Sequence, residues 1–240
     1  MYKPTDKLLE GIRNGFRLQL FPWDDYFPRM AQTDWKLGRT GVAVKSYFIR
    51  NAPFSGAYAL LGGITDGLRT ITDLSFRDPA FRAGMLDMGY DIGFVRWLEQ
   101  EGRLKLKIYA PSEGQVFFPN EPIVTITGAL PHIRLAEGVL TEALNYPSLS
   151  LTKWYRLVRA VRPGSVMDFS RRRSQNSSKA TLYAMLAGCR FTSNSEMRRF
   201  FNFSVVGTMG HEWVQSFGDV RAAFKAWLDA NPNRPVGLVD

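Results

Sequence analysis

The sequence predicts an α/β chain, with an N-terminal α+β domain over residues 1–130 followed by a partial (β/α) domain over residues 131–240. In the first part, short β-rich runs and helical stretches are separated by proline and glycine. In the second part, short apolar strands alternate with helices, which implies parallel pairing and right-handed crossovers. The chain has 240 residues, 45% of them hydrophobic, so it can form a substantial core and is not disordered.

The elements of the first part follow from hydrophobic periodicity. The predicted helices are residues 24–35, 57–70 and 91–101. The predicted β-rich runs are residues 42–50, 104–110, 115–118 and 122–127. Together they predict a small α+β or barrel-like domain.

The second part begins with an apolar stripe from Ile133 to Leu144, which predicts a helix that stops before Pro147. Ser150 or Thr152 is then expected to cap a separate helix. Three strand–helix pairs and one last strand are predicted beyond it: 165–169 with 179–187, 190–192 with 196–201, 204–207 with 210–230, and 235–239.

Polar residues cluster where each of these predicted strands ends. The four clusters are residues 168–173, 192–194 and 208–211, and Asp240. In α/β sheets, ligands bind at the carboxyl ends of the strands, so four polar ends indicate a functional site. If the first strand continues through its arginines, alternation places Arg172 on the face of Asp168 and Ser170.

His211 is one of two histidines, and it lies off the apolar stripe of the helix predicted over residues 210–230. A helix N-terminus disfavours the cationic imidazole and its free N–H groups attract anions. A phosphate-accepting histidine therefore suits this position, although an ordinary polar residue at a helix start would suit it equally. His132 has no comparable polar neighbours in the sequence and is predicted to be structural.

The net charge of +9 is concentrated in one segment. Residues 151–200 contain eleven Lys and Arg against two acidic residues, and the remainder of the chain is balanced. This distribution favours a localised anion site over a merely solvated basic face. A nucleic-acid surface remains a remote alternative, because no recognised nucleic-acid motif accompanies the charge.

Other classes are excluded by what the sequence lacks. A single cysteine, Cys189, rules out an intramolecular disulfide and a cysteine-based zinc cluster. No Walker or Gly-x-Gly-x-x-Gly loop is present, and no 18-residue apolar run or signal region appears. We therefore expect a cytoplasmic protein.

Several motifs resemble those of the nicotinate phosphoribosyltransferases, which are type II phosphoribosyltransferases. Residues 207–213 (Gly-Thr-Met-Gly-His-Glu-Trp) resemble that family's Gly-Thr-x-Ala-His-Glu/Ser-Trp signature, and residues 168–173 are similar to its acidic-Phe-Gly-x-Arg-Arg motif. Residues 192–194 match its Thr-Ser-Asn, and residues 48–59 resemble its Phe-x-Arg-x-x-Pro-Phe-Gly-Gly-x-Tyr segment. The resemblance covers most of the chain.

The resemblance implies that nicotinate and phosphoribosyl pyrophosphate (PRPP) form nicotinate mononucleotide and pyrophosphate, with ATP and Mg²⁺ participating, in NAD biosynthesis. It implies that ATP phosphorylates His211, that Arg172 and Arg173 hold anionic groups, and that Tyr26 lines the nicotinate pocket. No metal ligand from the protein is implied. The full set of implied substrate-binding residues is Tyr26, Asp168, Arg172, Arg173, Thr192, Ser193, Asn194, Thr208 and Asp240.

Ser193 bears on the choice of substrate. The nicotinamide-using sibling enzyme has an aspartate at this position, and a carboxylate there would repel nicotinate, so Ser193 favours the acid. The chain departs from the family pattern at Ser170, Phe191 and Gly210, where small residues are usual. The bulky Phe191 leaves open an inactive or regulatory homologue, and the nicotinamide-using enzyme is a further alternative.

The resemblance also implies the architecture, which is an irregular (β/α) barrel of the type II phosphoribosyltransferase kind. A complete barrel takes about 250 residues, so residues 131–240 provide roughly its first half. The sequence therefore predicts a fragment, a short homologue, or a split subunit whose partner chain supplies the C-terminal half. A homodimer is implied as well.

Overall fold

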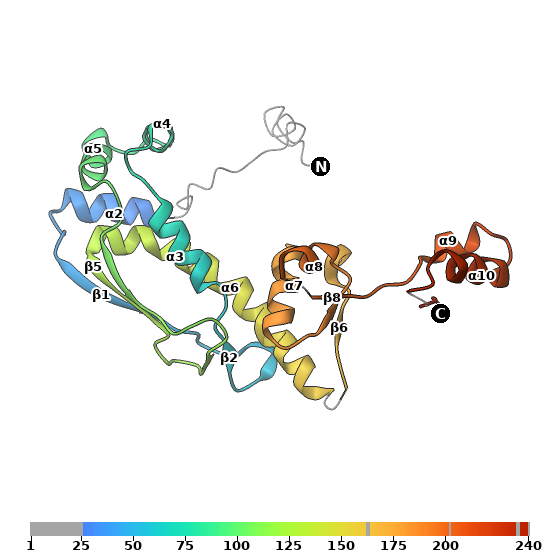
Figure 1. Cartoon of the computed structure of the whole chain (residues 1–240). Coiled ribbons are helices and arrows are strands. Elements are labelled where there is room, and N and C mark those ends of the chain that lie inside the picture. Colours follow the sequence, from blue (N-terminus) through green and yellow to red (C-terminus); the bar gives the residue numbers. More distant parts are fainter. Residues whose placement is uncertain (1–25, 162–163, 202, 234–235, 240) are drawn as a thin grey trace, which may run out of the picture. The chain divides into compact units, whose positions relative to one another are not determined.

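The computed structural model describes residues 26–161, 164–201, 203–233 and 236–239. The chain divides into two compact units, unit 1 (Met1–Tyr146) and unit 2 (Pro147–Asp240). The sequence analysis placed the domain boundary after residue 130, whereas the two units divide within helix α6 (Leu130–Ala160), which contains residues of both (Figure 1). The chain is mixed α/β, as predicted.

Unit 1 contains two antiparallel sheets. The first has the strand order β1-β5-β3, and the second pairs β2 with β4. The strands are β1 (Val42–Tyr47), β2 (Ala59–Leu60), β3 (Leu106–Tyr109), β4 (Val116–Phe117) and β5 (Val124–Ala129). Side chains alternate across the larger sheet, with Val124 and Ile126 buried and Val42 and Val44 exposed. The predicted β-rich runs are thus confirmed.

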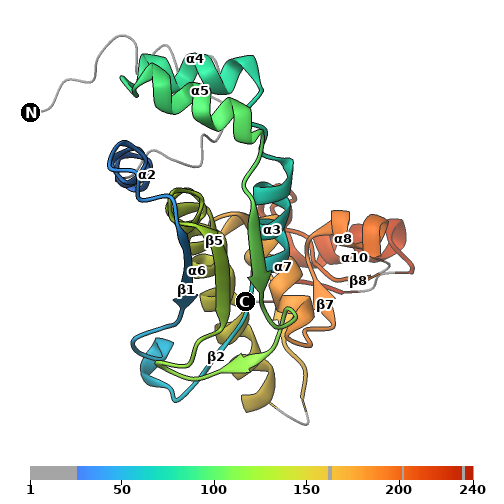
Figure 2. The same ribbon diagram turned by 90° about the vertical axis from the view of Figure 1, so that its left-hand side faces the viewer.

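The helices of unit 1 are α2 (Phe27–Lys36), α3 (Ile64–Asp73), α4 (Pro79–Asp87) and α5 (Ile92–Glu101), and η1 (Pro53–Ser55) is a 3₁₀ turn. Asp78 and Asp91 cap α4 and α5 by accepting hydrogen bonds from backbone N–H groups of the first turns. Figure 2 shows α4 and α5 running alongside each other. The sequence analysis did not predict α4.

One continuous apolar core holds unit 1 together. It joins side chains from α5, β5 and the first half of α6, including the fully buried Phe94, Leu98, Ile126, Leu135 and Leu140. Each buried side chain of this size stabilises the fold by about 1.5–3 kcal/mol relative to an exposed one.

The predicted helix over residues 57–70 begins in the wrong place. Ala59 and Leu60 pair instead with β4, and α3 starts only at Ile64. Gly63 adopts a positive φ of 87° directly before α3, a conformation that glycine allows. The carboxylate of Glu113 accepts hydrogen bonds from Gly63 N (2.9 Å) and Thr65 N (3.0 Å), which satisfies the first turn.

The predicted helix break before Pro147 is also wrong, because α6 continues through this proline to Ala160. Pro147 removes one backbone donor, but both flanking segments bury apolar faces, and Leu151 is fully buried. The Thr152 hydroxyl donates to Ser148 O at 2.6 Å within the same helix and does not cap a new one.

Unit 2 contains a parallel sheet of three short strands in the order β6-β7-β8. They are β6 (Met167–Asp168), β7 (Phe191–Thr192) and β8 (Ser204–Val205), with helices α7 (Ser177–Leu186) and α8 (Ser195–Phe201) between them. The predicted alternation of parallel strands and helices is confirmed for these elements.

Two predictions for the end of unit 2 are wrong. The helix expected over residues 210–230 is two helices, α9 (His211–Gln215) and α10 (Val220–Ala230). Gly218, at φ 69°, turns the chain, and Asp219 accepts hydrogen bonds from the first turn of α10. The Trp213 ring consequently contacts Trp227 at 5.4 Å between centroids. Residues 236–239, expected in a strand, are in none.

No helix among the described residues is both long enough and apolar enough to cross a membrane.

Candidate functional site

The parallel sheet of unit 2 brings two polar segments to one edge, and a third follows its last strand along the chain. Because β6, β7 and β8 are adjacent and parallel, their carboxyl ends lie at the same edge. The segments that follow them are the ones predicted from the sequence: the arginine triplet after β6, Ser193-Asn194 after β7, and Thr208 to His211 after β8. The structure therefore brings the first two segments to one edge of the sheet, whereas Thr208 to His211 come after Val206 and Gly207 and lead into α9.

Asp168 ends β6, and its side chain is fully buried. Its Oδ1 accepts from Ser170 N at 2.9 Å. Its Oδ2 accepts from the hydroxyls of Thr181 and Thr192, each at 2.8 Å. Both carboxylate oxygens thus bind protein donors, and Asp168 ties β6, β7 and α7 together.

The segment after β7 is held by Asp168 in two ways, through the Thr192 hydroxyl that donates to its carboxylate and through its backbone carbonyl. The Thr192 hydroxyl accepts from Asn194 N at 3.0 Å, and Ser193 N donates to Asp168 O at 2.8 Å. Asn194 Oδ1 accepts from Glu196 N at 3.2 Å at the start of α8. Thr192 and Asn194 are buried and Ser193 is half-buried, so Ser193 is the residue of this motif that reaches the surface.

The arginine triplet does not extend β6. The strand ends at Asp168, and Ser170–Arg172 form the 3₁₀ turn η2, so the predicted alternation of Arg172 with Asp168 is wrong. The Asp168 carboxylate stabilises this turn by accepting from Ser170 N. Arg171 pairs with Glu196 at 3.6 Å, and the other two arginines are exposed. Exposed guanidinium groups suit bidentate contacts to phosphate or carboxylate.

His211 is exposed and is the first residue of α9. Since α9 has only five residues, the helix-dipole effect expected from a long helix is much reduced here. Thr208 is exposed nearby in the sequence, and its hydroxyl donates to Met209 O at 2.9 Å. Thr208 is thus on the segment between β8 and α9, and His211 is at the start of a helix, as the sequence predicted.

The remaining predicted site residues lie elsewhere. Tyr26 belongs to unit 1, where it precedes α2 with 58% of its surface exposed, and its ring contacts Phe27. Asp240 lies outside the described residues. The seven other predicted substrate-binding residues, together with His211, belong to unit 2.

His132 is a structural residue, as predicted. It is fully buried, and its Nδ1 accepts from Lys105 N at 3.0 Å. Burial lowers the pKa of this imidazole, and the nearby Lys105 ammonium lowers it further, whereas the Glu101 carboxylate raises it.

Sequence reasoning missed two residues that support the site. Thr181 is a fully buried polar side chain on α7, and the only signal was a hydroxyl within an apolar helical run. Cys189 Sγ lies 3.0 Å from Val166 O and 3.3 Å from Phe191 O, bridging the segments that lead into β6 and β7. Burial raises the pKa of the Cys189 thiol, which disfavours its thiolate form.

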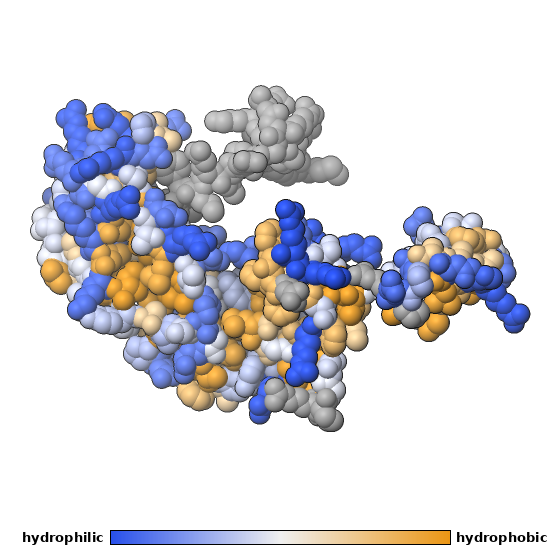
Figure 3. Space-filling view, in the orientation of Figure 1, coloured by the Kyte–Doolittle hydropathy of each residue, from blue (hydrophilic) through white to orange (hydrophobic). Residues whose placement is uncertain are grey.

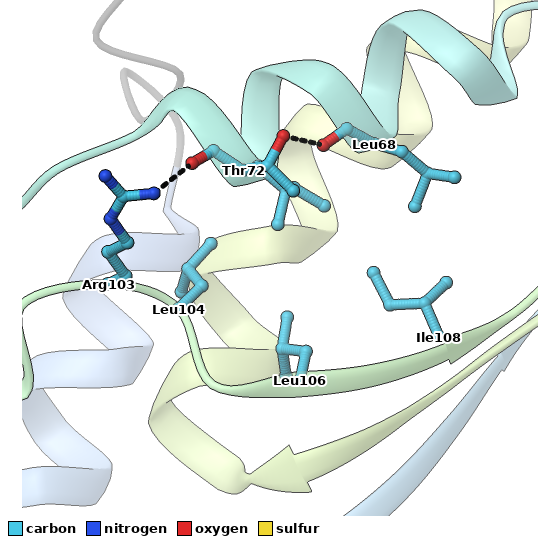
Figure 4. Close-up of a pocket in the computed structure, with 7 residues that line it drawn as sticks. Leu68, Thr72, Arg103, Leu104, Leu106 and Ile108 are labelled. Carbon is cyan, nitrogen blue, oxygen red and sulfur yellow. Dashed lines mark hydrogen bonds between the residues drawn. The ribbon is translucent and has the colours of Figure 1, made fainter.

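A separate cavity of about 300 Å³ lies in unit 1, between α3 and β3 (Figure 4). Its lining is largely apolar, with Arg103 donating to Thr72 O at 3.0 Å at one end. None of the predicted site residues lines it. Among the described residues, no group of three His, Cys, Asp or Glu side chains could hold a metal ion.

These features define an α/β protein with polar, arginine-bearing loops at the carboxyl edge of a parallel sheet. Residues 23–145 match the nicotinate phosphoribosyltransferase (NAPRTase) N-terminal domain. The chain belongs to the nicotinate phosphoribosyltransferase family.

Named relatives agree with this assignment. The chain is 32% identical over 219 residues to nicotinate phosphoribosyltransferase pncB2 of Mycobacterium tuberculosis, covering 87% of this chain and 46% of that protein. It is 28% identical over 221 residues to the nicotinate phosphoribosyltransferase of Bacillus subtilis, covering 90% and 45%. The chain thus spans about half the length of the curated relatives it matches.

Solved structures show a similar fold. The crystal structure of human nicotinic acid phosphoribosyltransferase matches 80% of this chain and 40% of the human chain, with 30% identity and a TM-score of 0.67. A nicotinate-nucleotide pyrophosphorylase from Pyrococcus furiosus matches 95% of this chain with a TM-score of 0.65, and at 19% identity it supports the fold alone.

Proposed function

We propose that this chain provides the nucleotide-forming loops of a nicotinate phosphoribosyltransferase. The supporting observation is that two family motifs, residues 168–173 and 192–194, meet at one edge of the parallel sheet, and that the third motif follows the next strand, β8, along the chain. Because the relatives are about twice as long, the activity is assigned to this chain together with the portion that they carry beyond the match.

In the proposed reaction, the pyridine nitrogen of nicotinate forms a bond to C1′ of PRPP as the bond from C1′ to the pyrophosphate oxygen breaks. Positive charge develops on the ribose while negative charge leaves with pyrophosphate. The exposed Arg172 and Arg173 can stabilise the departing anion through fixed guanidinium donors. Mg²⁺ is proposed to enter with the pyrophosphate of the substrate and not to bind a protein site.

ATP coupling is proposed to act through His211. An imidazole nitrogen attacks the γ-phosphorus of ATP, ADP leaves, and water later hydrolyses the phosphohistidine to phosphate. The exposure of His211 makes this nitrogen accessible to a nucleotide. The transient phosphate adds negative charge on the loop that bears Thr208, close in sequence to the proposed substrate contacts.

Ser193 is proposed to select nicotinate over nicotinamide. It is half-buried, and its backbone N–H is fixed to Asp168 O, so the side chain occupies a defined position at the sheet edge. A serine hydroxyl can donate to the nicotinate carboxylate, whereas an aspartate would repel it. Tyr26 is proposed to line the ring pocket of the assembled enzyme.

The inactive-homologue alternative rested on Phe191, which replaces a family glycine. In the structure, Phe191 pairs with Met167 of β6 and Ser204 of β8. The bulky residue is therefore accommodated within a regular parallel ladder, and this observation favours an active site of normal backbone geometry.

We further propose that β6, β7 and β8 belong to a (β/α) barrel and that the working enzyme is a dimer or contains a partner chain.

The test is an assay with nicotinate, PRPP, Mg²⁺ and ATP. The chain should form nicotinate mononucleotide, alone or when mixed with the part of the Mycobacterium relative that lies outside the match. His211→Ala should abolish ATP hydrolysis but leave slow transfer, while Lys225→Ala, an exposed change on α10, should alter neither. The proposal is wrong if the wild-type chain forms no product either alone or in the mixture. Unchanged ATPase activity in His211→Ala would show that this histidine does not have the proposed role.

A further inference from the structure

We propose that Asp168, Thr181 and Thr192 form a buried relay of hydrogen bonds that positions Ser193 and Asn194 toward the substrate. The first and third of these residues were expected to contact the substrate themselves. This inference rests on the proposed function, and it adds Thr181, which belongs to none of the family motifs, as a positioning residue.

The relay begins at the Asp168 carboxylate, which has no exposed surface. A carboxylate can only accept hydrogen bonds. The hydroxyls of Thr181 and Thr192, both 2.8 Å from Oδ2, must therefore both be donors. Their hydrogens are fixed in direction, although isolated hydroxyls rotate freely.

The direction of the Thr192 hydroxyl hydrogen also determines which donor its oxygen can accept from. With its hydrogen directed at Asp168, its lone pairs are available to Asn194 N, which donates at 3.0 Å. The backbone adds a second link, because Ser193 N donates to Asp168 O at 2.8 Å. Both residues of the loop after β7 are thus attached to the end of β6.

The relay ends at the side-chain amide of Asn194. Its Oδ1 accepts from Glu196 N at 3.2 Å, which determines which way the amide faces. Its Nδ2 is buried and has no hydrogen-bond partner in the part of the chain that the structure describes. An unsatisfied buried donor is costly unless a ligand acceptor completes it. We assign this donor to an oxygen of the bound substrate.

Thr181 provides the cleanest test, because it is buried on α7 and is not one of the residues proposed to contact substrate. Thr181→Val keeps the shape and removes one donor to Asp168. The carboxylate then loses its anchor on α7 and can rotate more freely, so the Thr192 hydroxyl and the loop bearing Ser193 are held less rigidly. Thr181→Ser keeps the hydroxyl and should restore wild-type behaviour. Thr141→Val is the matched control, because its hydroxyl bonds only the backbone of its own helix at Glu137 O.

The first measurement is hydrogen exchange on the 240-residue chain. The amides of Ser193, Asn194 and Glu196 should exchange about tenfold faster in Thr181→Val, as expected for weakening one buried hydrogen bond. Thr181→Ser and Thr141→Val should match wild type at these amides. If the Thr181→Val chain does not fold, the same measurement is made on Asp168→Asn. This variant exchanges one carboxylate acceptor for an amide donor at constant volume. Unchanged exchange at these three amides overturns the relay.

The second measurement is the steady-state kinetics of nicotinate mononucleotide formation, made with whichever preparation is active, the chain alone or the chain mixed with the part of the Mycobacterium relative outside the match. Thr181→Val should raise KM for nicotinate by about fivefold to tenfold, with kcat and His211-dependent ATP hydrolysis nearly unchanged. Faster exchange without any change in KM would show that the relay is merely structural and would overturn the positioning role. If wild type makes no product, the proposed function fails instead, and the exchange comparison alone then decides whether the relay holds the loop.

Discussion

The two units of the chain are stabilised in different ways. Unit 1 has one large apolar core in which Phe94, Leu98 and Leu140 have no exposed surface. In unit 2, one small core cluster consists of Val158, Ala184 and Cys189, with Trp154 and Val166 packed against it. Phe200 and Phe201 on α8 remain 67% and 52% exposed, and Figure 3 shows apolar surface over the segment with α9 and α10.

This difference in stabilisation indicates that unit 1 provides stability and that unit 2 positions side chains. Unit 1 gains its stability from the burial of large side chains, which does not depend on direction. In unit 2, the strands are two residues long, and their ends are held by directional hydrogen bonds centred on Asp168. Such bonds fix the positions of nearby groups, which a catalytic or binding edge requires.

The largest expected effect is in the core of unit 1. Phe94→Ala removes a ring that contacts those of Trp35 and Trp97 at 5.7 and 5.9 Å. It should lower the free energy of unfolding of unit 1 by about 3–5 kcal/mol, measured by urea denaturation. Phe200→Ala, the same change at an exposed site of unit 2, should cost less than about 0.5 kcal/mol. Equal losses would contradict the contrast between the units.

A smaller effect concerns pH. Because burial lowers the pKa of His132, the unfolded chain binds this proton more readily. Stability should therefore be complete above about pH 6.5 and should fall as the pH drops from there through the folded-state pKa, on the order of 1 kcal/mol per unit of pKa lowering.

The variant His132→Asn, which keeps an acceptor for Lys105 N, should remove this pH dependence from urea midpoints measured at pH 7.5 and 5. His211→Asn is the control and should retain it, since this histidine is exposed. If the dependence survives in His132→Asn, another group is responsible.

The smallest effect tests the helix break in unit 2. Asp219 accepts from the N–H groups of Arg221 and Ala222 at the start of α10. Asp219→Ala should cost about 1 kcal/mol and speed hydrogen exchange in the first turn of α10. Asp229→Ala, which removes only an exposed pair with Lys225, should change little. Identical exchange in both variants would refute the capping role.

Much of the fold was predictable because local patterns agreed with the tertiary structure. Alternating side chains predicted β1, and the apolar residues between Ile92 and Leu98 predicted α5. The predictions were wrong where tertiary packing overrode a local sequence signal. Pro147 indicated a helix end, yet buried neighbours such as Leu151 keep α6 continuous. The apolar residues from Trp213 to Trp227 suggested one long stripe, but the chain turns at Gly218 into two helices that pack through Trp213 and Trp227.

The sequence by itself determined the alternation of strands and helices in unit 2, the family motifs and the residues that follow each strand, because these are properties of neighbouring residues. Only the tertiary structure decided which of those residues are accessible. It exposed Arg172, Arg173, Thr208 and His211, and it buried Asp168, Thr192 and Asn194. The physical reason is that a hydrogen-bond partner such as Thr181 comes from a different element, and sequence spacing does not record which hydroxyls converge on one carboxylate.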